Sequence, residues 1–161
     1  MSGAVGPTSG YSGTPLPRKL GLKPGHVVFL DGAPAGFDLA GMLDPAEAAA
    51  IVWPRRLPAY ADVTVTFHYR AESLAKRLPA LVDRTARPAT QSLSVAYGML
   101  WVCWPKKAAH KQLQAEGVVV DLDENQVRDL GLTAGLVDVK VAAIDEVWSG
   151  LKFVRRLVDR V

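Results

Sequence analysis

The clearest strand pattern in the chain is a short apolar run near its centre. Residues 98–107 read Gly-Met-Leu-Trp-Val-Cys-Trp-Pro-Lys-Lys, so a glycine and a proline bound a stretch of β-favouring side chains. Such a run is typical of a strand that is buried on both faces, as in a parallel sheet covered by helices. The pattern therefore predicts a central strand over residues 100–104.

Apolar or alternating segments predict further strands on both sides of the central one. They cover residues 26–30, 62–69, 136–145 and 151–157, and a turn at 146–150 joins the last two into a hairpin. Residues 46–53 stay ambiguous, because the alanines favour a helix whereas Ile51-Val52-Trp53 favours a strand.

Helices are predicted between these strands. One begins at Pro34 and ends near Met42, and another covers residues 72–83, where leucines recur at helical spacing despite Pro79. A third begins at residues 121–124, with Glu124 reaching back as in a capping box, and ends at Gly135. The remaining connections are expected to be a loop over 84–97 and a polar segment with one helical turn over 108–117.

The order of these elements predicts the fold class. Strands and helices alternate until the final hairpin, which favours a single open, mostly parallel, Rossmann-like α/β sheet of about six strands with a C-terminal antiparallel β-hairpin. The chain has 161 residues, 49% of them hydrophobic, which suits one domain. We expect that domain to cover residues 15–161, after a flexible tail over residues 1–14 that is rich in Gly, Ser, Pro and Thr.

The composition indicates which locations and binding partners are expected for the protein. No apolar run is long enough for a membrane-spanning helix and no signal-peptide pattern begins the chain, so a cytoplasmic protein that does not bind membranes is expected. Cys103 is the single cysteine and the three histidines lie far apart in the sequence, so neither a disulfide within the chain nor a metal site is expected. The net charge of +3 is too small to predict extended nucleic-acid binding.

Basic residues follow several of the predicted strands. If these strands are parallel, their carboxyl ends meet at one edge of the sheet, where ligands of open α/β folds bind. Cations and helix N-terminal amides at such an edge suit a phosphate group. The predicted anion-binding residues are Gly32, Gly36, Arg55, Arg56, His68, Arg70, Trp104, Lys106 and Lys107. The N-terminal residues Tyr11, Arg18 and Lys19 are placed to cap that edge. The alternative is that these cations only keep the strand ends soluble.

The two tryptophans of the central strand are expected to differ in role. Trp101 and Trp104 are three residues apart and so point to opposite faces of the sheet. Trp101 is expected in the core, and Trp104 could stack on a base or ring at the edge.

A methyltransferase site would need two features that the sequence lacks. They are an acidic residue followed by Gly-x-Gly after the first strand, and an acidic residue after the second strand to hold the ribose. Residues 31–36 instead read Asp-Gly-Ala-Pro-Ala-Gly, and Arg55 and Arg56 occupy the second position. The sequence thus carries no S-adenosylmethionine signature, and its cofactor stays unknown.

Two resemblances extend this interpretation. Residues 135–154, together with the strand and capped helix before them, are similar to the C-terminal half of class I methyltransferases, which implies methyltransferase-like topology. Tyr-Ser-Gly-Thr-Pro-Leu at 11–16, Trp-Pro-Lys-Lys at 104–107 and Trp-Ser-Gly-Leu at 148–151 resemble the bacterial "domain of unknown function" family numbered 3052. That resemblance runs from Tyr11 almost to the end of the chain, although residues 85–97 are longer than is usual there. It implies no activity, because the family is uncharacterised.

These observations favour a binding function over an enzyme. The expectation is a non-catalytic ligand-binding or regulatory domain whose basic edge holds a phosphorylated small molecule, a nucleotide or an acidic partner. One alternative is a divergent S-adenosylmethionine-dependent methyltransferase or other group transferase. Another is an adaptor that docks a protein partner, and a homodimer is also open.

Overall fold

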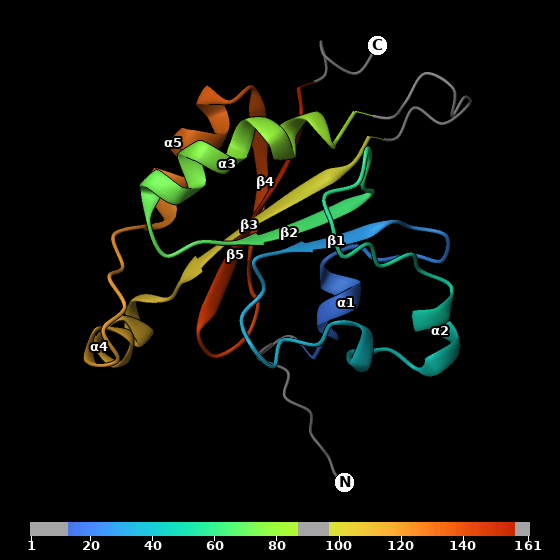
Figure 1. The fold of residues 1–161 in the computed structure, drawn as a ribbon, viewed down its shortest axis with the longest axis horizontal. Coiled ribbons are helices and arrows are strands. Elements are labelled where there is room, and N and C mark those ends of the chain that lie inside the picture. The colour runs from blue at the N-terminus through green and yellow to red at the C-terminus, as the bar shows by residue number, and fades with distance from the viewer. Residues whose placement is uncertain (1–12, 87–96, 157–161) are drawn as a thin grey trace, which may run out of the picture.

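A computed structural model of the chain describes residues 13–86 and 97–156. Its five strands form one open sheet in the order β1-β2-β3-β5-β4 (Figure 1). The strands are β1 (Val28–Asp31), β2 (Val63–Phe67), β3 (Met99–Pro105), β4 (Leu136–Ala143) and β5 (Trp148–Arg155). The first three are parallel, and β5 runs antiparallel to both β3 and β4. The mixed α/β class is therefore as predicted, with five strands in place of about six.

The missing strand is the ambiguous segment at 46–53. Its first part forms helix α2 (Pro45–Ala49), which Asp44 and Glu47 begin with a capping box. Its last part makes only a single parallel bridge, between Val52 and Val27. The alanine-rich part thus forms a short helix and the Ile-Val-Trp part makes one bridge, so the segment does not form a strand of the sheet.

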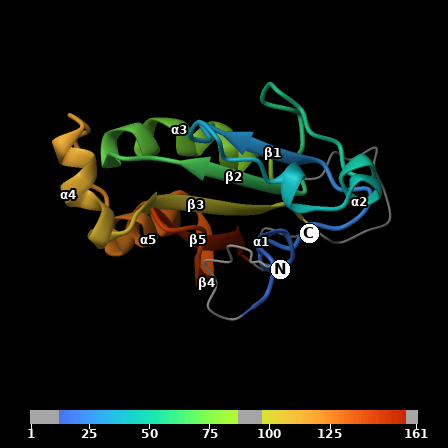
Figure 2. The same ribbon diagram turned by 90° about the horizontal axis from the view of Figure 1, so that it is seen from below.

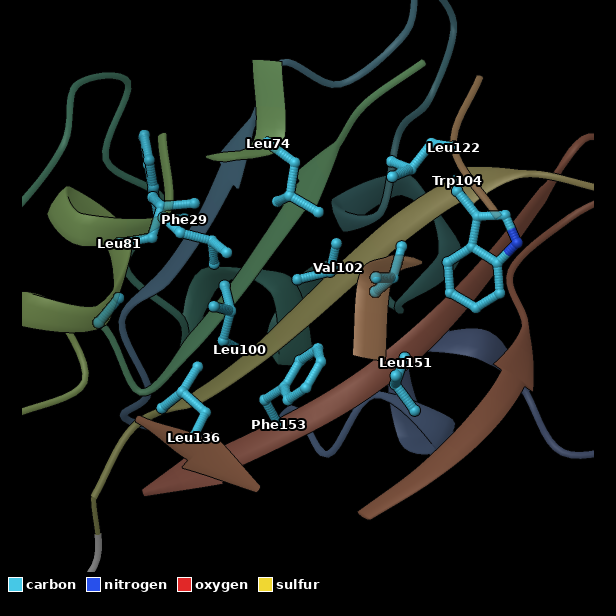
Figure 3. Close-up of a cluster of buried hydrophobic side chains, with 13 residues drawn as sticks. Phe29, Leu74, Leu81, Leu100, Val102, Trp104, Leu122, Leu136, Leu151 and Phe153 are labelled. Atoms are coloured by element: carbon cyan, nitrogen blue, oxygen red, sulfur yellow. The ribbon is translucent and has the colours of Figure 1, made fainter. Parts of the chain in front are cut away.

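Helices cover the two faces of the sheet unequally. Helices α3 (Ala71–Asp83) and α5 (Glu124–Thr133) lie together on one face, and α1 (Leu16–Lys19), the 3-10 turn η1 (Ala40–Met42) and α2 lie toward the other (Figures 1 and 2). The core beneath α3 and α5 gathers leucines, Val102, Trp104 and Phe153 (Figure 3). The opposite core contains Trp101, whose indole N–H donates to the carbonyl of Leu20 at 3.1 Å. The two tryptophans therefore lie on opposite faces, as their spacing predicted.

Four local expectations need correction. The predicted helix from Pro34 is only the three-residue η1, because Gly36 has a φ of +84° and so cannot belong to a helix. The predicted polar connection at 108–117 is the nine-residue helix α4 (Lys107–Ala115), which has no buried residue and extends past the end of β3 (Figures 1 and 2). The capping box of α5 pairs Asp123 with Gln126 and does not use Glu124. Of the expected turn at 146–150, Trp148, Ser149 and Gly150 belong to β5.

Some expectations fall outside the described residues. Residues 1–12, which include Tyr11 and most of the expected tail, and residues 87–96 of the expected loop are among them. Within the described part of the chain, no helix combines the length and apolar character needed to cross a lipid bilayer.

Strand β2 positions the candidate site. Its residues alternate, so Val63, Val65 and Phe67 join the core on the α1 side. Thr64 and Thr66 point the other way, toward α3, and both are fully buried. His68, the next residue in this alternation, continues that polar row at the carboxyl end of the strand.

Candidate functional site

A cleft opens at the carboxyl ends of β1 and β2, beside the first turns of α3. We call it the first cleft; its volume is about 570 Å³, within the range of small-molecule sites. Its lining residues are Asp31, Gly32, Phe67, His68, Arg70, Glu72, Ser73, Lys76 and Arg77. The lining mixes carboxylates, cations and hydroxyl groups, and so can bind a polar ligand by several kinds of hydrogen bond.

A second, smaller cleft adjoins the first. It has a volume of about 330 Å³ and shares four lining residues with the first cleft, namely Phe67, His68, Arg70 and Ser73. Its remaining lining is Tyr69, Val118 and Val119, so this side is more apolar. Ser73 and His68 therefore lie where the two clefts meet.

A continuous chain of hydrogen bonds runs beneath the first cleft. Arg77 donates from Nε and Nη2 to the two carboxylate oxygens of Asp31, at 3.1 and 2.8 Å. Thr66 donates its hydroxyl to Asp31 Oδ2 at 2.8 Å and lies 2.7 Å from Nε2 of His68. The other ring nitrogen of His68, Nδ1, lies 2.6 Å from the Ser73 hydroxyl.

The donors in this chain fix the tautomer of His68. The single hydroxyl proton of Thr66 goes to Asp31, so Thr66 can only accept from His68, and Nε2 must carry the imidazole proton. Nδ1 of the neutral ring is then an acceptor, and Ser73 donates its hydroxyl to it.

The electrostatics favour this neutral imidazole. Burial lowers the pKa of His68 below its ordinary value of 6.5, and Arg77 adds to the lowering, while the Asp31 carboxylate opposes it. The residue is only 6% exposed, which accounts for the dominance of desolvation. The same Asp31 raises the pKa of Arg77 through their hydrogen bonds. His68 is therefore poised as a hydrogen-bond acceptor and base at neutral pH.

Aromatic rings pack beneath the other side of this strand end. Phe67 makes edge contacts with Phe37 and Trp148, at ring-centroid distances of 5.0 and 5.2 Å. Tyr69 lies 5.1 Å from the Trp148 ring. This packing holds the segment that carries His68 against Trp148 at the start of β5.

The predicted site residues fall into three groups. Gly32, His68 and Arg70 line the first cleft, and Arg70 also lies 3.4 Å from Asp121. Six others do not line either cleft. They are Gly36, Arg55, Arg56, Trp104, Lys106 and Lys107.

The surroundings of this second group differ from residue to residue. Arg55 and Arg56 are exposed after the Val52 bridge. Lys106 and Lys107 begin α4, and Trp104 is 6% exposed within the core.

Two capping residues form the third group. Arg18 and Lys19 lie on α1, and Lys19 donates to the carbonyl of Ala143 at 3.5 Å, at the carboxyl end of β4.

Sequence reasoning missed Asp31, Thr66, Ser73 and Arg77 as site residues. A usable signal was present in Val-Thr-Val-Thr-Phe-His at 63–68, where every second residue of a buried parallel strand is polar. Buried polar side chains require partners, so such a row predicts a hydrogen-bond network on that face. The identity of the partners could not be predicted, because Asp31 and Arg77 are 46 positions apart in the sequence.

Comparison with solved structures relates this fold to methyltransferases. The chain matches the magnesium protoporphyrin IX methyltransferase of Synechocystis PCC 6803, solved with bound SAH, with a TM-score of 0.53 and 14% identity over 83% of this chain and 75% of the other. It matches the pyocyanin biosynthetic protein PhzM with a TM-score of 0.60 and 12% identity, over 88% and 53%. A Streptomyces davawensis dimethyltransferase that acts on an amino-riboflavin matches with a TM-score of 0.52 and 16% identity, over 81% and 50%.

The likeness is one of fold. The chain spans about half the length of the last two proteins. Neither a family model nor a curated protein matches the sequence. The resemblance to the family numbered 3052 therefore stays a prediction.

These neighbours correct two expectations. The chain was expected to be a non-catalytic ligand-binding or regulatory domain, with an unknown cofactor and no S-adenosylmethionine signature. Its structural neighbours include methyltransferases, some of them solved with S-adenosylmethionine or its product SAH. At 12–16% identity the likeness concerns the fold, which can persist while a binding signature diverges, so the missing sequence motif does not exclude this class of protein. The alternative of a divergent methyltransferase is the better supported one.

Proposed function

We propose that this protein is a divergent group transferase that uses S-adenosylmethionine, and that the first cleft holds the cofactor. The observation that carries the proposal is the position of this cleft. It lies outside the carboxyl ends of two parallel strands of a methyltransferase-like sheet, where ligands of open α/β folds bind. The neighbours with the same fold supply the cofactor class.

The turn after β1 is compatible with close approach of a ligand. Gly32 has a φ of +70°, and a Cβ there would have Phe67 O, at 3.6 Å, as its nearest contact. A glycine in this conformation leaves the backbone accessible, as the first turn of a nucleotide site requires. Pro34 removes one amide donor from the turn, so side chains of the cleft must contribute more of the binding.

Glu72 is the residue that fits the place of the missing ribose-binding acid. It is exposed in the first turn of α3, lines the first cleft, and lies 4.0 Å from Lys76 with both side chains more than 70% exposed. An ion pair this exposed is weak, so the carboxylate is available to accept hydrogen bonds from ribose hydroxyls. Asp31 does not suit that role, because Arg77 and Thr66 already occupy its oxygens.

The second cleft suits the acceptor of the transferred group. When bound, S-adenosylmethionine supplies an activated methyl group that a nucleophilic atom of the acceptor can take. Tyr69, Val118 and Val119 offer an apolar wall for that acceptor. Ser73 and His68 lie between the two clefts, where a reacting atom of the acceptor would meet the cofactor.

Isothermal titration calorimetry with SAH tests this proposal. We expect saturable binding to the wild-type protein, and binding at least about 10-fold weaker to Glu72→Gln, because hydrogen bonds to a charged acceptor contribute about 1.5–3 kcal/mol. Glu146→Gln is the matched control, since Glu146 is exposed in the β4–β5 connection and lines neither cleft. Absence of SAH binding by the folded wild-type protein would contradict the proposal.

A further inference from the structure

Ser73 and His68 form a pair with the geometry of an activated nucleophile. Ser73 is exposed on α3 and reaches both clefts, while its hydroxyl donates to Nδ1 of the buried His68 at 2.6 Å. A hydroxyl is a weak nucleophile unless an adjacent base accepts its proton. His68 is such a base, because its neutral form is favoured and its Nδ1 already accepts from Ser73.

A third and a fourth group orient the base. Thr66 accepts a hydrogen bond from Nε2–H of His68 and donates its own hydroxyl to Asp31, which Arg77 holds by two hydrogen bonds. This arrangement fixes the ring plane and the tautomer, and the carboxylate stabilises the imidazolium that forms when His68 accepts a proton. A purely local helix-end contact between Ser73 and His68 would not require this chain of oriented partners.

Backbone donors for a developing oxyanion lie next to the same hydroxyl. The N-cap residue of α3 is Arg70, which makes no side-chain capping bond. The amide of Ala71 donates to Asp121 and that of Leu74 donates to the Arg70 carbonyl. The amides of Glu72 and Ser73 belong to the first turn and have no acceptor among the described residues. They can therefore stabilise negative charge on an oxygen bonded to the carbon that Ser73 attacks.

We propose that Ser73 is a catalytic nucleophile with His68 as its general base, and that the protein cleaves carboxylic esters whose acyl group is apolar. This activity goes beyond the proposed methyl transfer and needs no cofactor. Tyr69, Val118 and Val119 of the second cleft provide the apolar surface for the acyl group.

Hydrolysis of the ester at Ser73 needs no reactant other than water. Ser73 Oγ bonds to the ester carbonyl carbon and its proton moves to His68 Nδ1. The carbon–oxygen bond to the alcohol then breaks, and the alcohol leaves with the proton from His68. Water next attacks the acyl group on Ser73 and gives one proton to Nδ1. The acid leaves, and His68 returns that proton to Ser73 Oγ.

Labelling with a fluorophosphonate tests the inference directly. Such a probe loses fluoride and bonds to serines that a neighbouring base activates, so we expect mass spectrometry of digested protein to place the label on Ser73. Ser149 on β5 is a control within the same chain, because it lines neither cleft and should stay unlabelled. A folded wild-type protein without label on Ser73 would overturn the proposal.

Variants test whether Ser73 is labelled because His68 activates its hydroxyl or only because it is exposed. His68→Gln should slow labelling at least about 100-fold, the usual contribution of general base catalysis, and Ser73→Ala should abolish both labelling and hydrolysis of 4-nitrophenyl butyrate. Equal labelling rates in wild-type protein and folded His68→Gln would also overturn the proposal.

The pH dependence of the wild-type labelling rate is a second measurement, which does not depend on any variant folding. The groups that face His68 are Asp31 from β1, Thr66 from β2, and Ser73 and Arg77 from α3. Labelling should be level above pH 6.5 and fall below it as His68 gains a proton. A rate that does not fall at any pH at which the protein stays folded would contradict a histidine base. SAH binding is unaffected by either result, so the two proposals fail separately.

Discussion

His68 is the residue whose chemistry depends most on its surroundings. It is buried, and both of its ring nitrogens have hydroxyl partners within 2.7 Å. Burial without an ionic partner in direct contact makes the protonated form costly. The folded protein therefore resists protonation of this residue, whereas the unfolded chain does not.

This difference predicts a stability change with pH. Because the folded-state pKa of His68 lies below 6.5, the unfolded state binds more protons between that pKa and 6.5. The contribution of His68 to stability is thus fully present above about pH 7 and is lost as pH falls through the folded-state pKa. Urea unfolding from pH 8 to pH 5 should show a steeper loss of free energy in wild-type protein than in His68→Gln. Parallel curves for the two proteins would show that His68 is not buried as a neutral group.

Part of the site could be predicted at the level of single residues. The rule that ligands bind at the carboxyl ends of parallel strands identified Gly32, His68 and Arg70, which line the first cleft. It also selected Lys106 and Lys107, which follow β3 but begin α4 and line neither cleft. The direction in which a chain leaves a strand depends on tertiary packing, and the local sequence does not encode it.

Elements with a strong apolar face were predictable, and those without one were not. The leucines of α3 are buried as their spacing indicates, and β3 is central in the sheet. Helix α4 was missed because none of its residues is buried, so its sequence carries no apolar stripe that would mark a helix. The sequence could not decide between helix and strand for residues 46–53. The helix and the bridge that form there are both too short to produce a recognisable repeat of apolar residues.

The contact between α5 and the sheet depends on one glycine. A Cβ on Gly131 would lie 2.1 Å from the ring of Phe153 on β5, far inside van der Waals contact. Alanine favours helices over glycine by about 1 kcal/mol, but the clash should outweigh this gain. We expect Gly131→Ala to lower the free energy of unfolding by about 1–3 kcal/mol in urea titrations.

A matched control lies two residues earlier in the same helix. Asp129→Ala changes an exposed position and should alter stability by no more than about 0.5 kcal/mol. A Gly131→Ala protein as stable as this control would mean that α5 does not pack closely on β5.

At the scale of the whole molecule, the fold contains a methyltransferase-like sheet in which β1 is the edge strand on the N-terminal side. Beside β1, the described residues form only a single bridge, between Val27 and Val52, where a further strand would extend the sheet. The sheet therefore ends at β1 on this side, and the first cleft lies at the carboxyl ends of β1 and β2.

The central claim is that the first cleft is the transferase site, and an NMR titration of the ¹⁵N-labelled protein with SAH tests it most directly. If the cofactor binds there, chemical-shift changes should be concentrated in the amides of Gly32, His68, Glu72 and Ser73, and the amides of α4 should not shift. Shifts centred on Lys106 and Lys107, or no shift at saturating SAH, would contradict it.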